Sequence, residues 1–200
     1  MKNRLASLAL VLILAGIACG PTGATPTVPP IPPTDPPATT APEVPTTDPL
    51  AGWLTYAHAD CSFQIRVPPG SIITPGADTD TIGLPFVPGT NLTEKYLAVT
   101  CRTGVVPCES PYAEGYAPGT LPVDIRDING ITFAVMSGGD AGAGNYYQWT
   151  AYSTASGSRC IDLSFMLHSV NAMNFVPPIP EFDQAAESAI FDEIMDTFTW

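Results

Sequence analysis

The distribution of proline is the feature that most constrains the fold of this chain. Eleven of its 23 prolines lie between Gly20 and Leu50, together with eight threonines and no aromatic residue. A segment of this composition buries too little apolar surface to offset the entropy of folding, so we expect an unfolded but stiff tether with polyproline character. The residues that can build a core therefore begin near Ala51, and about 150 residues suffice for one domain.

The first 18 residues have the pattern of an export signal. Lys2 and Arg4 precede an apolar run over residues 5–18. This run is too short to span a bilayer, which takes about 20 helical residues, and it fits the core of a signal peptide. We therefore predict a signal peptide over residues 1–18.

Cys19 follows small residues in a way that resembles the signal motif of bacterial lipoproteins, although Gly16 stands where Leu is usual. The resemblance implies that the Cys19 thiol is acylated, for example with palmitate, and that cleavage makes it the first residue. An ordinary secretory signal cut near Cys19 is the alternative. We predict a lipidated Cys19 and tether over residues 19–50, one globular domain over residues 51–200, and an extracytoplasmic location on the cell membrane or outer membrane.

The net charge of the chain argues against two classes of partner, nucleic acids and anionic lipid surfaces. It carries 19 acidic and 7 basic residues, for a formal net charge of -12. Affinity for nucleic acids comes mostly from Lys and Arg that neutralise phosphates, so we expect no nucleic-acid partner. Anionic lipid headgroups would also repel the domain, so the expected contact with the membrane is through the N-terminal lipid alone.

Alternating apolar residues predict a β-rich domain. Asn129-Gly130 between two such segments is a strong signal for a hairpin, because both turn residues need positive φ. The predicted strands are residues 62–67, 95–101, 123–128, 131–136, 146–154 and 158–168. On the last strand, one face carries Ile161, Leu163, Phe165 and Leu167, and the other carries Asp162, Ser164, Met166 and His168. The Gly- and Pro-rich segments 68–88, 104–122 and 137–144 are predicted loops.

The end of the chain predicts one amphipathic helix, from Pro180 to about Thr197, which makes the domain α+β. Apolar residues recur every four positions, at Phe182, Ala186, Ile190 and Ile194. The helix region also carries six acids, Glu181, Asp183, Glu187, Asp192, Glu193 and Asp196, and no base. We expect these acids to face solvent, and a docking face for a basic partner is the alternative.

Three of these features occur in an order that resembles the PsbP-like fold. They are a strand that runs into Pro68-Pro69-Gly70, the hairpin at Asn129-Gly130, and a closing helix that ends in residues 195–198. The resemblance implies a twisted antiparallel sheet of about five to seven strands with the C-terminal helix packed on it. The family includes extrinsic photosystem subunits and small bacterial lipoproteins, most of them non-enzymatic accessory or assembly factors. This chain lacks the helix that many members have after the first strand.

Four cysteines lie in the predicted domain: Cys61, Cys101, Cys108 and Cys160. An even number in an exported domain is most simply explained by two disulfides, for which three pairings exist. We favour Cys61 with Cys101, which border strands that can be neighbours, and Cys108 with Cys160. A local bridge between Cys101 and Cys108 is the rival. The absence of a Cys-x-x-Cys pair argues against a redox or zinc site.

His168 shares a strand face with Asp162 and Ser164, which raises the alternative of a hydrolase triad. Residues two apart on a strand are about 6.5–7 Å apart, beyond direct hydrogen bonding of their side chains. The chain also has no Gly-x-Ser-x-Gly motif. We therefore predict no catalytic residue and no enzyme.

Three aspartates are candidate ligands for Ca²⁺. Asp78 and Asp80 lie in the predicted loop 68–88, and Asp140 lies among glycines in the loop 137–144. Carboxylate oxygens in loops are the ligands that Ca²⁺ prefers. Neither loop fits the EF-hand pattern, and nothing in the sequence brings the two together.

An aromatic cluster is the candidate binding surface. Alternation places Tyr146 and Tyr152 on one face of their strand and Tyr147 and Trp149 on the other. We expect one set to fill the core, and the other to form a surface for a peptide or a sugar. Tyr146, Tyr152 and His168 are the candidate residues of this surface.

The sequence thus predicts an exported, lipid-anchored accessory protein without catalytic activity. Its expected partner is another exported protein or a component of the cell wall, and no cofactor or resident metal is expected. The alternative is an extracytoplasmic sensor module that binds Ca²⁺ or a small ligand.

Overall fold

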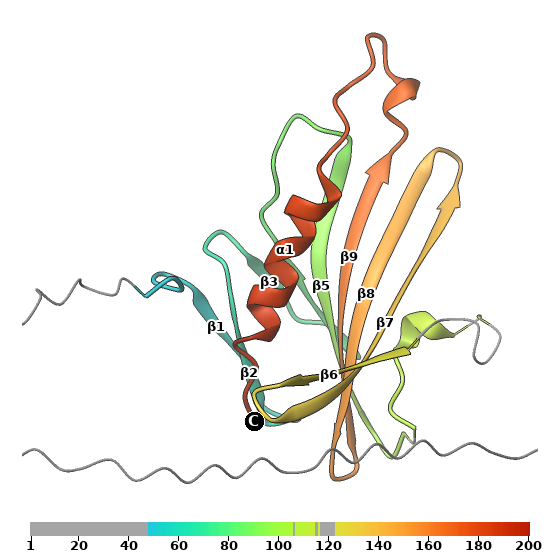
Figure 1. Cartoon of the computed structure of the whole chain (residues 1–200). Coiled ribbons are helices and arrows are strands. Elements are labelled where there is room, and N and C mark those ends of the chain that lie inside the picture. The colour runs from blue at the N-terminus through green and yellow to red at the C-terminus, as the bar shows by residue number, and fades with distance from the viewer. Residues whose placement is uncertain (1–47, 106, 115, 117–122) are drawn as a thin grey trace, which may run out of the picture. The chain divides into compact units, whose positions relative to one another are not determined.

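The computed structural model describes residues 48–105, 107–114, 116 and 123–200 (Figure 1). They belong to one compact unit, Thr46–Trp200. The predicted signal peptide, Cys19 and nearly all of the predicted tether lie outside the described residues. The unit contains an apolar core and two disulfides of its own, so we expect it to fold without the residues that precede it. None of the helices described is long and apolar enough to cross a membrane.

The main sheet has seven strands in the described residues, in the order β3-β4-β5-β9-β8-β7-β6, and all neighbours are antiparallel. Its strands are β3 (Ile72–Thr74), β4 (Thr79–Gly83), β5 (Leu92–Thr103), β6 (Val123–Ile128), β7 (Ile131–Gly142), β8 (Asn145–Ser156) and β9 (Arg159–Val170). One α-helix, α1 (Gln184–Met195), lies across the sheet (Figure 1). The predicted α+β architecture is confirmed.

A second, two-stranded sheet joins the beginning of the unit to its end. It pairs β1 (Leu54–His58) with β2 (Phe63–Val67). Gln64 of β2 forms an isolated bridge with Thr199, with N–O distances of 2.9 and 3.0 Å. The Thr197 hydroxyl accepts a further hydrogen bond from the Arg66 N–H. The C-terminal residues are therefore fastened to β2.

The two faces of the main sheet differ in what covers them. We call the face of Ile161, Leu163, Phe165 and Leu167 the helix face, because these residues share one core with α1. Within it, the Phe165 ring stacks on Phe191 of α1 at 4.3 Å between centroids. We call the opposite face, which carries Asp162, Ser164, Met166 and His168, the outer face. The predicted alternation along β9 is confirmed.

A shorter segment covers part of the outer face. It contains the 3-10 helix η1 (Pro111–Ala113), and its Tyr112 packs against a small cluster of Trp149, Ala151 and Met166. A second 3-10 helix, η2 (Ala172–Asn174), follows β9. The outer face is thus partly buried although no α-helix covers it in the described residues.

The six predicted strands exist, but the prediction of loops over 68–88 and 137–144 is wrong. The first segment contains β3 and β4, which pair with each other, and β4 also pairs with β5, which lies beyond the segment. The second continues β7 up to a tight turn at Ala143-Gly144, where both residues have positive φ. The prediction also missed β1. At Asn129-Gly130 both residues have positive φ, so the predicted hairpin turn is confirmed.

The helix begins at Gln184 rather than at Pro180, because the Asp183 carboxylate caps it by accepting the Ala186 N–H at 3.1 Å. Its buried positions are Glu187, Phe191, Ile194 and Met195. The buried stripe is therefore rotated from the predicted one, and Ala186 is exposed.

The expectation that all six acids of the helix region face solvent is wrong for Glu187. Its carboxylate lies 2.7 Å from the Lys95 ammonium, and both side chains are buried. The Val87 N–H donates to the other carboxylate oxygen at 2.8 Å. This ion pair joins α1 to β5 inside the core.

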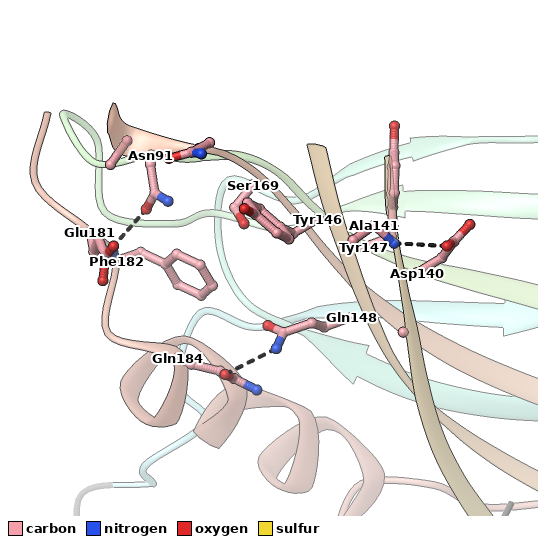
Figure 2. A pocket seen from close by; sticks show the side chains of 13 residues that line it. Asn91, Asp140, Ala141, Tyr146, Tyr147, Gln148, Ser169, Glu181, Phe182 and Gln184 are labelled. Carbon is pink, nitrogen blue, oxygen red and sulfur yellow. Dashed lines mark hydrogen bonds between the residues drawn. The ribbon is translucent and has the colours of Figure 1, made fainter. Parts of the chain in front are cut away.

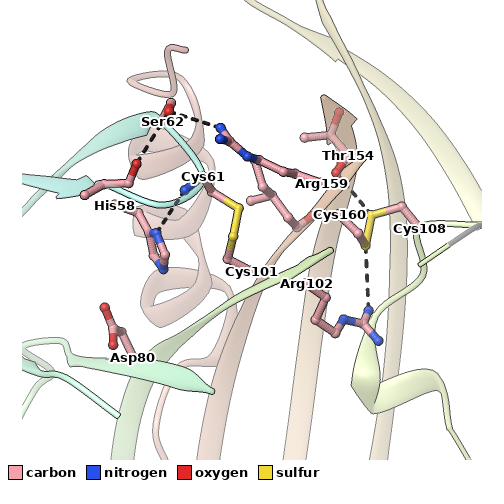
Figure 3. Close-up of a disulfide and its surroundings, with 12 residues drawn as sticks. His58, Cys61, Ser62, Asp80, Cys101, Arg102, Cys108, Thr154, Arg159 and Cys160 are labelled. Carbon is pink, nitrogen blue, oxygen red and sulfur yellow. Dashed lines mark hydrogen bonds between the residues drawn. A yellow bond between two sulfur atoms is a disulfide. The ribbon is translucent and has the colours of Figure 1, made fainter. Parts of the chain in front are cut away.

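The disulfides connect Cys61 with Cys101 and Cys108 with Cys160, which is the pairing favoured from the sequence (Figure 3). The first joins the end of β1–β2 to β5 on the helix face. The second joins the segment before η1 to the beginning of β9 on the outer face. Both close loops between residues far apart in the chain, with separations of 40 and 52.

Candidate functional site

A groove of about 580 Å³ opens at the end of the main sheet where β5 begins and β9 ends (Figure 2). We call it the end groove. Its floor comes from β7 and β8, including Asp140, Tyr146 and Gln148. Its walls come from Asn91 and from both ends of the connection between β9 and α1. It is therefore built by segments that are distant in the sequence.

Asn91 holds this connection in place. Its side-chain oxygen accepts the Phe182 N–H at 2.9 Å (Figure 2). Its side-chain nitrogen donates to the Val170 carbonyl at 2.8 Å. The Asn91 N–H also donates to the Pro180 carbonyl at 2.9 Å. One buried side chain thus fixes both ends of the residues 171–182 at the wall of the groove.

The lining combines amides, hydroxyls and aromatic rings. Gln148 of β8 and Gln184 of α1 are joined by a hydrogen bond of 3.2 Å across the groove. Tyr146 is 42% exposed, and Phe182 is a second aromatic residue of the lining. Amides and hydroxyls offer both donors and acceptors, while the rings offer flat apolar surface. Such a lining suits a ligand with many hydroxyl or amide groups.

The charged groups of the groove are acidic. Glu181 and Asp140 line it, although Asp140 pairs with Tyr147 and so directs its side chain to the outer face, and the described lining contains no Lys or Arg. An anionic ligand would meet like charge, whereas a neutral or cationic ligand would not.

The three predicted Ca²⁺ ligands do not come together. Asp140 lies on β7 at the end groove, while Asp78 and Asp80 lie at β4, with β5, β9 and β8 between. Asp80 accepts hydrogen bonds from the Tyr56 hydroxyl at 2.6 Å and from the Gly76 N–H at 3.0 Å. Burial acts to raise the pKa of Asp80, but these two donors and the nearby His58 hold that pKa below its ordinary value. Its carboxylate is thus already engaged by protein groups.

Among the described residues, His58, Cys61 and Cys101 form the one group close enough to hold a metal ion (Figure 3). Both cysteines of this group belong to a disulfide, so their sulfurs are not thiolate ligands. His58 Nδ1 accepts the Cys61 N–H at 3.3 Å, which explains why the ring lies there.

The hydrolase alternative finds no geometric support. Ser164 is fully buried, and its hydroxyl donates to Asp162. The expectation that side chains two apart on a strand do not bond is therefore wrong for this pair, because both side chains lean toward each other. His168 lies further along β9, where its Nδ1 meets Glu94 at 2.9 Å and its Nε2 meets Asn145 at 3.0 Å. Serine and histidine do not share a site.

Asp162 is instead the centre of a buried network of hydroxyl groups on the outer face. It is 1% exposed and accepts from Ser153 at 2.7 Å as well as from Ser164, whose hydroxyl lies 3.2 Å from that of Ser110. Burial raises the pKa of Asp162, and the hydroxyl donors oppose that rise only in part.

The three residues of the predicted aromatic surface lie in different places. Tyr146 lines the end groove. His168 is on the outer face, stacked on Tyr147 at 4.2 Å between ring centroids. Tyr152 is 2% exposed and belongs to the core, so its assignment to a binding surface is wrong. Its hydroxyl donates to Asp192 at 2.9 Å, and burial raises its pKa.

The sequence interpretation missed most of the groove lining, namely Asn91, Gln148, Phe182 and Gln184. Each of these contacts joins segments between 36 and 91 residues apart in the chain. One feature of the sequence does point to the wall of the groove. The connection between β9 and α1 is proline-rich and contains no charged residue before Glu181.

No protein-family model matches the sequence, and no curated protein matches it. Solved structures with a similar arrangement include the cyanobacterial PsbP (CyanoP) of Synechocystis, with 11% identity, a TM-score of 0.44 and coverage of 74% of this chain and 91% of that one. The Ran-binding protein Mog1p of Saccharomyces cerevisiae has 9% identity and a TM-score of 0.47, covering 74% and 94%. A protein of Bacteroides thetaiotaomicron has 14% identity and a TM-score of 0.43 over 68% of this chain.

The present chain spans only 44% of the length of the Bacteroides protein. The sequence motifs resemble the PsbP-like fold, and a PsbP protein is among the solved structures to which this chain is similar.

Proposed function

We propose that the protein is a non-catalytic, exported binding module, held at the membrane by a lipid on Cys19, whose end groove binds a neutral, hydroxyl-rich component of the cell envelope. The chemistry of the groove supports this proposal. Amide side chains and carboxylates bind hydroxyl groups, and exposed rings stack on the apolar faces of a sugar. The two acids of the groove and the absence of a base in its described lining disfavour an anionic ligand.

The ligand is tested on the unit Thr46–Trp200 by thermal unfolding with neutral oligomers of N-acetylglucosamine and, separately, with Ca²⁺. A ligand that binds only the folded state raises the free energy of unfolding, by about 2.7 kcal/mol at one hundred times its Kd. We expect a rise in Tm with the oligomers.

Tyr146→Ala removes the exposed ring of the groove and should abolish that rise. Trp200→Ala is the matched control, since Trp200 is 46% exposed, close to the 42% of Tyr146, and lies outside the groove. A rise that persists in Tyr146→Ala would place the ligand elsewhere. No rise up to about 10 mM oligomer contradicts the proposed ligand, and a rise with Ca²⁺ that Asp140→Asn removes would favour the sensor alternative.

The anchor is tested separately in the full chain. Cys19→Ser removes the thiol that would carry the lipid, so the protein should move from the membrane fraction to the released fraction. Two acyl chains are needed for stable attachment, and the acidic domain offers no electrostatic substitute. If the variant stays with the membranes as the parent does, the anchor is wrong.

A further inference from the structure

The outer edge of β6 is a strand edge that no other strand covers in the described residues. Two large apolar side chains of β6, Val123 and Ile125, are 55% and 64% exposed. An open edge of this kind presents unpaired backbone N–H and C=O groups, and proteins usually protect it with Lys, Pro, bulges or short length. β6 has the sequence Val-Asp-Ile-Arg-Asp-Ile, without Lys, Pro or a bulge, so charged side chains (Asp124, Arg126 and Asp127) are the protection that it carries.

The opposite edge of the same sheet is protected. Its strand β3 has only three residues. Pro68-Pro69-Gly70 precedes it and Pro75 follows it directly, so neither end can extend the ladder. The two edges of one sheet therefore differ, and only the β6 edge is long enough to accept a partner strand.

The direction of the free backbone groups follows from the hairpin turn. A two-residue turn makes its flanking residues, Ile128 and Ile131, a hydrogen-bonded pair, and such pairs alternate along the ladder. Arg126 and Asp124 therefore also bond to β7, whereas the N–H and C=O groups of Val123, Ile125 and Asp127 point outward. In agreement, the Ile125 N–H bonds not to β7 but to the Asp124 carboxylate at 2.9 Å, and this local contact must open before the N–H can bond to a second strand.

We propose that this edge is a homodimer interface, in which β6 pairs antiparallel with β6 of a second copy about a two-fold axis at Ile125. The outward groups of Ile125 then bond to those of the second copy's Ile125, and Val123 pairs with Asp127. Asp124 lies opposite Arg126 at the non-hydrogen-bonded positions, where side chains across two strands are closest. A two-fold axis makes this ion pair twice.

The charges of Asp124 and Arg126 favour the register with the axis at Ile125 over the two neighbouring registers. Shifting the axis to Arg126 places two arginines opposite each other, and shifting it to Asp124 places two aspartates opposite each other. Only the axis at Ile125 brings outward backbone groups together and opposes unlike charges. Within its own copy, Arg126 lies 2.9 Å from Asp192 through Nη1 and 3.8 Å from Asp124 through Nε, so its Nη2 group is available to the second copy's Asp124.

In this register residues 123–127 pair on each side, which makes a small interface, so the dimer should be weak in free solution. On a membrane, where the proposed lipid anchor would concentrate the chains, the same contact gains from a higher effective concentration. This gain rests on the proposed anchor, whereas the pairing itself does not, and the experiment below uses a chain without Cys19.

Cysteine cross-linking of the unit Thr46–Trp200 tests the register. Its own four cysteines form two disulfides, so an introduced cysteine is the only free thiol. Ile125→Cys should form disulfide-linked dimers at least ten times faster than Ile72→Cys, a matched control of similar exposure on the protected edge. Val123→Cys and Asp127→Cys should each cross-link slowly alone and rapidly when mixed. Equal rates for Ile125→Cys and Ile72→Cys would overturn the proposal.

Charge reversal provides a second test that needs no cysteine. Asp124→Arg places two arginines across each copy of the ion pair, and Arg126→Asp places two aspartates there, so each variant should sediment as a monomer at concentrations where the parent associates. An equimolar mixture restores both unlike pairs and should associate again. Circular dichroism verifies that both variants are folded. A mixture that associates no better than the separate variants would refute the register.

Discussion

The two faces of the main sheet each bury one carboxylate and one disulfide, but they treat the carboxylate differently. On the helix face, Glu187 meets the Lys95 ammonium at 2.7 Å. On the outer face, the hydrogen bonds to Asp162 come from serine hydroxyls. The first carboxylate is stabilised by an opposite charge in direct contact, and the second chiefly by neutral hydroxyl donors, with a smaller contribution from the charge of Arg102.

This difference separates two ways to keep a polar group inside a fold. Removal of one partner of a buried ion pair lowers the free energy of unfolding, because the remaining charge is then buried alone. A carboxyl held by hydroxyls can take up a proton and become neutral, so its cost depends on pH. Removal of one partner of the ion pair on the helix face should therefore lower the free energy of unfolding. The contribution of Asp162 on the outer face to that free energy should instead depend on pH.

The largest effect should come from the ion pair. Glu187→Ala leaves the Lys95 ammonium buried without its partner, and we expect a loss of about 3–5 kcal/mol in the free energy of unfolding. It also removes the acceptor of the Val87 N–H. Urea unfolding of the unit Thr46–Trp200 measures this loss.

The double variant Lys95→Met with Glu187→Leu is the control. It replaces both charges by apolar groups, so it should lose much less stability than Glu187→Ala. A double variant as unstable as the single one would mean that packing at α1, and not the buried charge, sets the loss.

An intermediate effect should come from packing on the outer face. A Cβ at Gly138 would lie 2.5 Å from the Trp149 ring, so Gly138→Ala must displace the indole from its place. We expect a loss of about 1–3 kcal/mol in the free energy of unfolding. Gly142→Ala on the same strand is the control, since nothing lies within 4 Å of its Cβ. Equal stability of the two variants would show that the outer cluster adjusts freely.

Asp162→Asn should have the smallest effect. At acidic pH we expect it to change the free energy of unfolding by about 1 kcal/mol or less. Because burial raises the pKa of Asp162, the folded protein keeps a proton that the unfolded chain has already lost. The free energy of unfolding must therefore fall as the pH rises from the ordinary pKa of Asp to the raised one. The amide introduced by Asp162→Asn cannot ionise, so the variant should become more stable relative to the parent as the pH rises.

Urea unfolding of both proteins from pH 4 to pH 8 measures this trend, with Asp140→Asn at the exposed end groove as control. Parallel pH curves for the parent and Asp162→Asn would mean that the carboxyl does not gain a proton on folding.

The parts of the fold that local pattern predicted are those that local interactions build. Asn129-Gly130 predicted its hairpin because both residues tolerate positive φ, and the alternation along β9 predicted which side chains enter the core. In contrast, β3 and β4 were missed. They are short, and they become strands because β4 pairs with β5 and β3 pairs with β4.

The site was less predictable than the fold. Tyr146 and Asp140 were singled out for separate reasons, a peptide or sugar surface and a Ca²⁺ site, yet they line one groove. Asn91, which positions the wall of that groove, carries no local signal because its partners are Val170 and Phe182, far along the chain. In the sequence, nothing separates Glu187 from the other acids of the helix, because its partner Lys95 lies 92 residues away in the chain.

The disulfide between Cys61 and Cys101 has a mechanical consequence. The sheet β1–β2 is separate from the main sheet, and it is the first structure that a pull on the N-terminal side of the unit would reach. Beyond Cys61 the force passes through a covalent bond directly to Cys101 on β5. Residues 62–100, which include β3 and β4, therefore lie off the line of tension, and the protected edge of the sheet is shielded from a load applied on the N-terminal side of the unit.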